Sequence, residues 1–452
     1  MEKLHENDLF LEKIKTLINE NKNEVLKKEL SNFHYADVAE IIKQISLDEA
    51  IHIVKLLESD ISAEALAEVD ESFRERIIRK LSAKEIAEEI EELDTDDAAD
   101  LVGELPEILQ EKVLSKIEDT EHSQDIRELL NYEEGTAGAL MAKELVSVNE
   151  NLSVINCVRE MRKQAKEVTR VHSIYVINSK NKLLGRLSLK DLLTASTNSK
   201  VKNIYIPNVD FVNVNEDVNE VANIMSKYDL EAIPVVNDKK QLLGRITIDD
   251  VLDIIKEEAD KDYQLAAGIS KEVEANDNIF QLTRARLPWL FLGLIGGLGS
   301  VFILKDFEEI MIKSELRSLF FYTPLIAAMA GNVGVQSSAI IVQGIANQVI
   351  KGSLINRLFK EIGLGLINGL ILSIVLIIFG EIINQDMLLS LTVAGSMMSV
   401  IILSALIGTF VPIILHRQGF DPAIATGPFI TTANDIFGIF LFFYIAKSII
   451  GF

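Results

Sequence analysis

The chain has 452 residues, enough for about three domains of ordinary size, and it combines 25% charged residues with a mean hydropathy of +0.22. The combination arises because the acidic residues and the apolar residues are concentrated in different parts of the chain. Residues 1–283 carry a net charge of −24. Residues 284–452 carry +1, from ten Lys and Arg against nine Asp and Glu. Such acidity argues against nucleic-acid binding and is compatible either with divalent cations as partners or with solubility alone. A single cysteine, Cys157, excludes an intrachain disulfide.

Residues 1–134 are predicted to form an acidic, all-helical amino-terminal domain. The first 20 residues are amphipathic and lack a long apolar core, so no signal peptide is expected and the soluble half is placed in the cytoplasm. The segment DVAEIIKQISLDEA (37–50) resembles EIAEEIEELDTDDA (85–98) at an offset of 48, which indicates stacked helix pairs. Six acids crowd the ten residues from position 91: Glu91, Glu92, Asp94, Asp96, Asp97 and Asp100. A solvated acidic face is the ordinary explanation of such a run.

An internal repeat defines the middle of the chain. IYVINSKNKLLGRLSLKDLL (174–193) recurs as IPVVNDKKQLLGRITIDDVL (233–252) at an offset of 59. Each copy predicts an apolar strand, a polar turn, a second strand after Gly185 or Gly244, and a helix that begins at an Asp. This order is similar to a pair of α/β CBS domains, here residues 135–198 and 199–258. In that family a Ser/Thr-x-x-Asp ending can hold the ribose of a nucleotide such as ATP, although the same residue types also cap helices. The matching residues are Ser188 with Asp191 and Thr247 with Asp250.

An acidic connecting helix, assigned to residues 259–283, follows the CBS pair. Its approach, IDDVLDIIKEEADKDY (248–263), places Asp250, Asp253 and Glu257 on one side by helical spacing. Because this helix leads to the first apolar span, an ion bound to it would be felt by a pore.

Residues 284–452 are predicted to be a membrane domain of five helices, because five apolar stretches are long enough to span a bilayer. They are approximately residues 287–304, 319–346, 362–383, 388–415 and 423–450. Basic residues gather before the first span, between the second and third, and between the fourth and fifth: Arg284, Arg286, Lys351, Arg357, Lys360 and Arg417. The positive-inside rule puts these loops in the cytoplasm and the carboxyl terminus outside. The expected location is the cell membrane.

Polar side chains interrupt the apolar spans. Asp435 is a carboxylate at mid-membrane depth, which costs roughly 2.5–3.5 kcal/mol on insertion scales and is rare without a partner. The second span adds further polar groups: Asn332, Gln336, Ser337, Ser338 and Gln343. Interhelical hydrogen bonding accounts for such residues singly, but together with Thr431 they suit a cation path. One carboxylate cannot enclose a bare ion, whereas two copies of Asp435 about a two-fold axis would hold a hydrated Mg²⁺.

The order of these parts resembles the MgtE family of magnesium channels over nearly the whole chain. The most specific matches are YEEGTAGALM (132–141), GNVGVQSS (331–338) and DPAIATGPFITTANDIFG (421–438). The resemblance implies a homodimer in which Asp435 of both subunits holds hydrated magnesium, with Thr431 and Asn332 on the pore. It also implies regulatory magnesium on acids of the cytoplasmic domains: Asp217, Asp229, Asp250, Asp253, Glu258, Asp94 and Asp97. Two departures are Val335, where the family often has a second Asn, and Lys261, where an acid is expected.

We therefore expect a magnesium channel, not an enzyme, with Mg²⁺ as both cargo and regulator and with a homodimer, lipid and divalent cations as partners. A transporter of Mn²⁺ or Co²⁺ and a non-conducting scaffold that senses adenosine nucleotides are the alternatives. An intramembrane metalloprotease would need a His-Glu-x-x-His helix and a phosphate-driven pump a Gly-Lys-Ser/Thr loop, and the sequence has neither.

Overall fold

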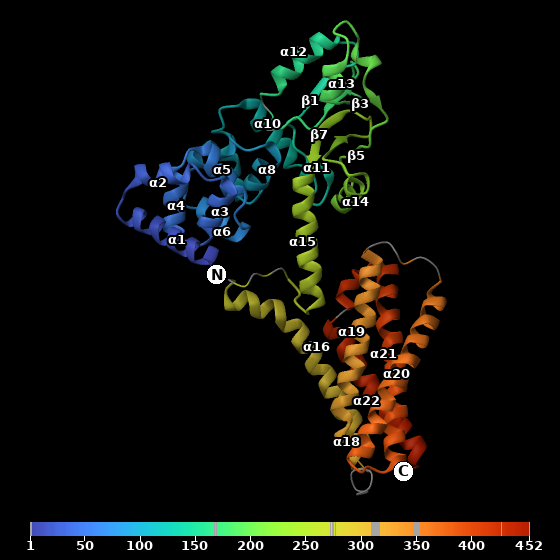
Figure 1. Cartoon of the computed structure of the whole chain (residues 1–452). Helices are drawn as coiled ribbons and strands as arrows, with labels where there is room; N and C mark the ends of the chain where they lie inside the picture. Colours follow the sequence, from blue (N-terminus) through green and yellow to red (C-terminus); the bar gives the residue numbers. More distant parts are fainter. Residues whose placement is uncertain are drawn as a thin grey trace. The chain divides into compact units, whose positions relative to one another are not determined.

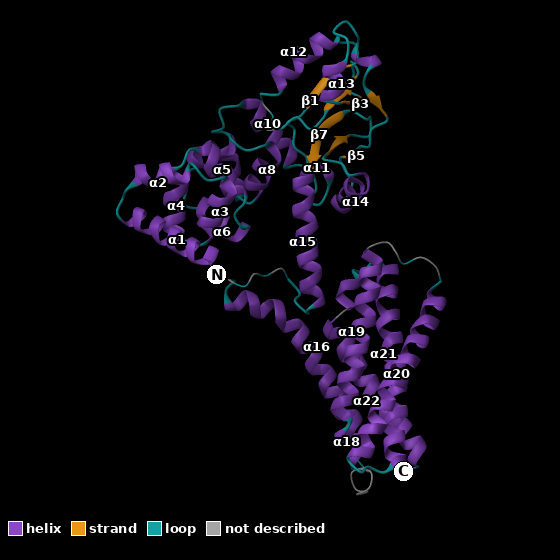
Figure 2. Cartoon of the chain, viewed as in Figure 1, coloured by secondary structure: helices purple, strands orange, loops and turns teal. Residues whose placement is uncertain are grey.

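The computed structural model describes residues 2–451 apart from 167, 169, 272, 274, 276, 309–316, 347–349, 351, 352 and 426. Lys351, one of the predicted loop cations, therefore lies outside the described residues. The chain divides into two compact units, Met1–Ile255 and Lys256–Phe452. Figures 1 and 2 show the first unit as helices followed by strands and helices, and the second as long helices. The predicted fold class, an all-helical part, an α/β CBS pair and five long apolar helices, is confirmed.

Short helices form the amino-terminal part of the first unit. They are α1 (Glu2–Asn19), α2 (Asn23–Leu30), α3 (Tyr35–Lys43), α4 (Leu47–Leu56), α5 (Ser59–Ala67), α6 (Glu71–Ile78), α7 (Ala83–Ile90), α8 (Thr95–Gly103), α9 (Glu107–Leu114) and α10 (Thr120–Leu129). Ser46 and Ser82 are the N-caps of α4 and α7, and each forms a capping box. In each box the serine hydroxyl accepts from the backbone N–H of the glutamate three residues later, Glu49 or Glu85, and the glutamate carboxylate accepts from the backbone N–H of the serine. The predicted 48-residue repeat corresponds to α3 with α4 and to α7 with α8.

The two CBS repeats each build a small sheet. The first contains α11 (Ala137–Leu140), β1 (Val146–Asn149), α12 (Val154–Gln164), β2 (Ile174–Ile177), β3 (Leu183–Leu187), α13 (Leu189–Thr194), η1 (Val201–Asn203) and β4 (Ile206–Pro207). The second contains β5 (Val212–Asn213), α14 (Val218–Tyr228), β6 (Ala232–Val236), β7 (Leu242–Thr247) and α15 (Ile248–Ala266). The sheet orders are β1-β2-β3-β4 and β5-β6-β7, in which β1 and β2, like β5 and β6, run parallel and the other neighbours antiparallel.

The strand registers repeat at the predicted offset of 59 residues. Ile174 pairs with Leu187 in the first sheet and Ile233 pairs with Ile246 in the second. The β2–β3 and β6–β7 turns meet, because Leu183 N donates to the carbonyl of Lys240 at 3.0 Å and Leu242 N to that of Asn181 at 2.9 Å. The repeats are thus paired through their turns.

One hydrophobic core joins the helices to the second CBS repeat. Ile86 and Leu101 of α7 and α8 belong to the same buried cluster as Ile233, Ile246 and Val251. This shared core fixes the start of α8 relative to β7 and α15, which matters for the acidic residues described below.

Five long helices form the second unit. They are α16 (Ile279–Asp306), α19 (Thr323–Ala346), α20 (Leu354–Ile382), α21 (Met387–Arg417) and α22 (Gly427–Ile450), with α18 (Ser318–Phe321) before α19 and η2 (Pro422–Ala425) before α22. Even the 24-residue helices are about 36 Å long, which exceeds a bilayer core of about 30 Å. The predicted five spans are confirmed by length and composition.

The helix ends differ from the sequence-based bounds in an informative way. The helix α20 begins at Leu354, eight residues before the predicted position 362, so that Arg357 and Glu361 lie within it. Arg284 and Arg286 likewise lie inside α16. Charged residues at span ends were interpreted as loop, whereas a helix can extend beyond the apolar core of a membrane with its polar residues in place.

Candidate functional site

Neighbouring residues of α22 face different surroundings. Asn434 is 1% exposed, and Asp435 is half-buried. Successive helical residues are rotated by about 100°, so Asn434 packs toward the helix bundle while Asp435 shares a face with Thr431, one turn earlier. Among the described residues, no hydrogen bond or ion pair is recorded for the Asp435 carboxylate.

A cavity of about 320 Å³ lies between α19 and α22 and brings the three predicted pore residues together. Asp435, Thr431 and Asn332 all line it, with Gln336 and Val335 further along α19. The absence of a side chain at Gly331 keeps space open beside Thr431 and Asp435. A Cβ at this position would lie 3.2 Å from Thr431 Cγ2 and 3.7 Å from Asp435 Oδ1. The predicted residues thus form one site.

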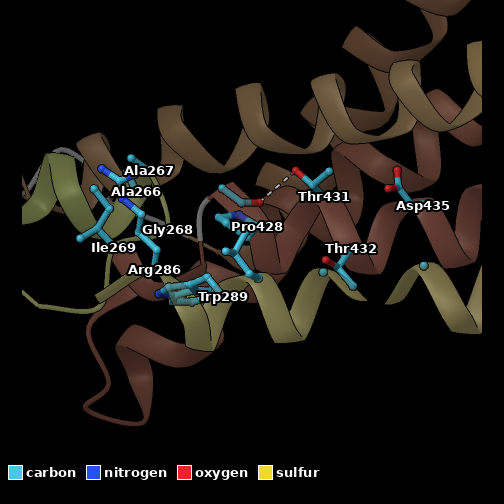
Figure 3. A pocket seen from close by; sticks show the side chains of 14 residues that line it. Ala266, Ala267, Gly268, Ile269, Arg286, Trp289, Pro428, Thr431, Thr432 and Asp435 are labelled. Atoms are coloured by element: carbon cyan, nitrogen blue, oxygen red, sulfur yellow. Dashed lines mark hydrogen bonds between the residues drawn. The ribbon is translucent and has the colours of Figure 1, made fainter. Parts of the chain in front are cut away.

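A second cavity, of about 950 Å³, reaches Asp435 from the side of α16 (Figure 3). It is also lined by Arg286 and Trp289 of α16, by the segment 266–269 that follows α15, and by Pro428 at the start of α22. Asp435 and Thr431 therefore border both cavities. A hydrated ion has space on two sides of the carboxylate.

The hydroxyl of Thr431 is already engaged. Its Oγ1 donates to the carbonyl of Gly427 at 3.0 Å, the dashed line in Figure 3. The resemblance implies that Thr431 lies on the pore, and the backbone carbonyl at this position sits one turn before Asp435. The side chain and the carbonyl at Gly427 satisfy each other and are not both available to an ion.

Glu361 is a buried acid whose environment the sequence did not reveal. It is 8% exposed and accepts a hydrogen bond of 3.4 Å from Ser337 Oγ of α19. Glu361 lies one residue before the predicted third span, which begins near residue 362, so its burial was not expected. The only available signal was the polar Ser337 and Ser338 pair on the neighbouring span, which needs a partner.

Acidic residues of the first unit gather where α8 begins. Asp94, Asp96 and Asp97 stand at the start of α8, Asp250 at the start of α15 and Glu64 on α5. We call these five residues the acidic cluster. Loss of hydration, followed by the charge of Asp250, raises the pKa of Asp97 to about 7 and also raises that of Asp96. Burial raises the pKa of Asp250 and of Glu64. Burial and the proximity of like charges thus both disfavour the ionised forms of these acids.

The acidic cluster is not a closed chelate. Within the described residues, no three Asp, Glu, His or Cys side chains are arranged to hold one metal ion. A hydrated dication, bound through its water shell, requires less exact placement than a bare one. The cluster brings together Asp94, Asp97 and Asp250 of the predicted regulatory set.

The other predicted regulatory acids lie elsewhere. Asp217 caps the amino end of α14 by accepting from Asn219 N at 2.9 Å, and Asp229 ends the same helix in the left-handed conformation. About 18 Å of helix separates these two residues, so they cannot share an ion within one chain. Asp253 is exposed on α15.

Glu258 belongs to the second unit, near acids that sequence analysis did not select. Burial, followed by the charges of Asp421 and Glu258, raises the pKa of Asp262. Asp262 follows Lys261 on α15, and Asp421 precedes η2. The segment predicted as a connecting helix, residues 259–283, is not one helix, because α15 ends at Ala266 and α16 begins at Ile279. The last turns of α15 thus bring carboxylates to the loop before α22.

The Ser/Thr-x-x-Asp pairs act as helix caps. Ser188 Oγ donates to Asp191 at 2.6 Å and accepts from Asp191 N at 3.1 Å. In the second repeat, Thr247 N donates to Asp250 at 3.1 Å. The structure therefore shows these residues in the helix-capping role that was the alternative to ribose binding.

Comparison with known proteins matches the helical domain, the CBS pair and most of the membrane domain. Family models match residues 323–445 (MgtE, divalent cation transporter), 33–135 (MgtE intracellular N domain), and 137–198 and 201–257 (CBS domain). The magnesium transporter MgtE of Bacillus subtilis is 33% identical over 323 residues, 71% of each chain. That of Thermus thermophilus is 33% identical over 326 residues, covering 71% of this chain and 72% of the relative.

Solved structures resemble the soluble part. The cytosolic domain of the Mg²⁺ channel MgtE in complex with ATP is 30% identical, covers 53% of this chain and 98% of its own, and superposes with a TM-score of 0.51. The soluble part of a magnesium transporter is 26% identical, covers 55% and 98%, and gives 0.50. With five apolar helices, and with relatives matched over more than two thirds of their length, the chain is a multi-pass membrane protein that belongs to the MgtE family of magnesium transporters.

Proposed function

We propose that the chain conducts Mg²⁺ into the cytoplasm through a pore at Asp435, in a homodimer. The observation that carries the proposal is the position of this carboxylate, which has no recorded partner among the described residues and borders two cavities. An unpaired acid within a membrane helix is costly and is retained where it serves an ion path.

The chemistry of the site suits a hydrated dication. Mg²⁺ gives up its water reluctantly and is commonly held through one or two carboxylates. Asp435 offers one charge, and Asn332 and Gln336 offer amide oxygens along the same cavity. A second copy related by a two-fold axis would add another Asp435, which is the reason for proposing a dimer.

We also propose that magnesium closes the pore from the cytoplasmic side. The basic residues near the span ends, Arg284, Arg286, Arg357 and Arg417, favour a cytoplasmic first unit. Burial first, and then the charges of neighbouring carboxylates, raise the pKa of Asp96, Asp97 and Asp250, and a dication would relieve the repulsion between these carboxylates. Asp217, Asp229, Asp253 and Glu258 would contribute further regulatory sites.

Adenosine nucleotide is a second proposed ligand, because a relative has been solved with ATP. The residues fit it, since an ionised carboxylate accepts more than one hydrogen bond: Asp191 can accept from Ser188, the residue that caps α13, and still accept from a ribose. ATP binding to the full chain, measured by calorimetry, should be weakened by Asp191→Ala. Unchanged affinity for ATP would show that the nucleotide does not bind at Asp191 of the first repeat.

The experiment for the pore measures ion uptake into proteoliposomes with Mg²⁺, Mn²⁺, Co²⁺ or Ca²⁺ outside. Mg²⁺ should enter through the parent, and Asp435→Ala should reduce entry at least about tenfold while the protein stays folded. Glu381→Gln is the matched control, because Glu381 is an exposed acid at the end of α20 and its loss should leave flux unchanged. Equal flux through folded Asp435→Ala would refute the pore; absent flux through the parent would favour the scaffold.

A further inference from the structure

The two CBS repeats carry an arginine at equivalent positions but bury only one of them. Arg186 in LLGRLS and Arg245 in LLGRIT are separated by the repeat offset of 59, and their strand partners, Tyr175 and Pro234, are equivalent as well. Arg186 is exposed, whereas Arg245 is 5% exposed. The difference must arise from what packs on β7.

The segment that enters the CBS pair covers Arg245. Ala142 N donates to the carbonyl of Arg245 at 2.8 Å, and Arg245 N donates to the carbonyl of Ala142 at 2.9 Å. Gly244 permits this approach, since a Cβ there would lie 2.6 Å from the Ala142 oxygen. The next residues hold α8, because Lys143 N donates to Thr95 Oγ1 at 2.8 Å and Thr95 Oγ1 donates to Glu144 at 2.8 Å.

The guanidinium of Arg245 consequently faces the start of α8. Its Nη2 lies 3.5 Å from Asp94 Oδ2, and its Nη1 donates to the carbonyl of Arg170 at 3.2 Å. Its Nε is buried and has no hydrogen-bond partner among the residues that the structure describes. A buried guanidinium retains its charge, because arginine does not lose its proton in proteins.

Asp94 differs from its counterpart in the helical repeat. Ser46, 48 residues earlier, accepts from Glu49 N and caps α4. Asp94 stands at the same position before α8 but forms no side-chain cap, and its carboxylate contacts Arg245 instead. A strong capping residue is thus directed to an arginine from another domain.

We propose that Arg245 is a fixed cation within the acidic cluster, which competes with a divalent cation for Asp94 and raises the ion concentration needed to fill the cluster. The inference rests on the proposed sensing of magnesium by this cluster. One permanent positive charge among the carboxylates reduces the attraction that an arriving dication experiences. It also holds α8 against β7 before any ion has bound.

The test measures the Mg²⁺ concentration at which the first unit of the full chain, in detergent, becomes protected from protease. Arg245→Gln keeps a donor but removes the charge, and should lower the midpoint about three- to tenfold. Arg186→Gln, the exposed equivalent, should leave the midpoint unchanged. Arg245→Lys keeps the charge and should stay within about twofold of the parent.

A double variant assigns the effect to Asp94. In an Asp94→Asn background, Arg245→Gln should shift the midpoint much less than in the parent, because the competed ligand is gone. Three outcomes would overturn the inference. Arg245→Lys and Arg245→Gln could shift the midpoint equally, Arg245→Gln could raise the midpoint, or Arg245→Gln could have the same midpoint as Arg186→Gln. If the parent itself gains no protection from Mg²⁺, it is the proposed sensor that fails.

Discussion

At the scale of single residues, the charge of Asp435 and its volume can be separated. Asp435→Asn keeps the shape and an oxygen between the two cavities but removes the negative charge. If electrostatic attraction holds the hydrated ion, flux should fall about as far as in Asp435→Ala, by at least about tenfold. The comparison is uptake of Mg²⁺ by proteoliposomes with equal amounts of each protein. Near-normal uptake through Asp435→Asn would mean that an oxygen dipole is sufficient.

Glu89 offers a second test at this scale, through pH. It is 8% exposed on α7 and accepts from Ser62 Oγ at 2.7 Å, and burial raises its pKa to about 7. Between about pH 4.5 and 7 the unfolded chain loses this proton before the folded chain does, so stability falls as pH rises and the penalty persists above 7. Glu89→Gln should therefore stabilise the first unit by on the order of 3 kcal/mol at pH 8 and by little at pH 4.5.

The measurement for Glu89 is the first thermal unfolding transition of the full chain in chelator at both pH values. Glu88→Gln is the control, since Glu88 is the exposed neighbour on the same helix. A gain of equal size at both pH values would show that packing of the amide, and not removal of a charge, is responsible.

Individual elements show where sequence-based prediction was adequate. The repeats and the five spans were predicted because hydropathy and periodicity are local properties of the chain. The burial of Arg245 could not be predicted, since Arg186 occurs in the same motif and tertiary packing alone distinguishes the two. The start of α20 was missed because Arg357 and Glu361 resemble loop residues, although Glu361 faces Ser337.

The crossing of α19 and α21 allows a prediction about packing. Gly408 lies directly against the carbonyl of Gly334, with Ser337 Cβ 3.1 Å from the position a Cβ would take. Gly408→Ala should force the helices apart and destabilise the second unit by roughly 1–3 kcal/mol. Gly395→Ala on the same helix meets nothing within 4 Å and should be neutral or slightly stabilising. Thermal aggregation in detergent ranks the two, and equal melting temperatures would contradict the close crossing.

At the scale of the whole molecule, the strong charge asymmetry supports the proposal that magnesium bound to the acidic first unit closes the pore. Carboxylates that repel one another favour an open arrangement, and dications between them favour a compact one. A near-complete switch needs about 5.5 kcal/mol of differential binding, which several weak sites acting together can supply. The acidic cluster would be one of these sites.

A variant that combines Asp97→Asn with Asp250→Asn tests whether removal of acids from the cluster keeps the pore open or closes it. The double variant removes ligands but also relieves repulsion, so it would remain open if bridging ions dominate and close permanently if repulsion dominates. We expect it to remain open, because the attraction of a doubly charged ion for the carboxylates that it bridges exceeds the repulsion between those singly charged groups. Single-channel recording should show conduction at Mg²⁺ concentrations about tenfold above those that silence the parent. Asp48→Asn with Asp60→Asn removes the same charge from exposed positions, and should close together with the parent. If this control also stays open, total charge is the sensor and the position of the acids at the start of α8 is immaterial.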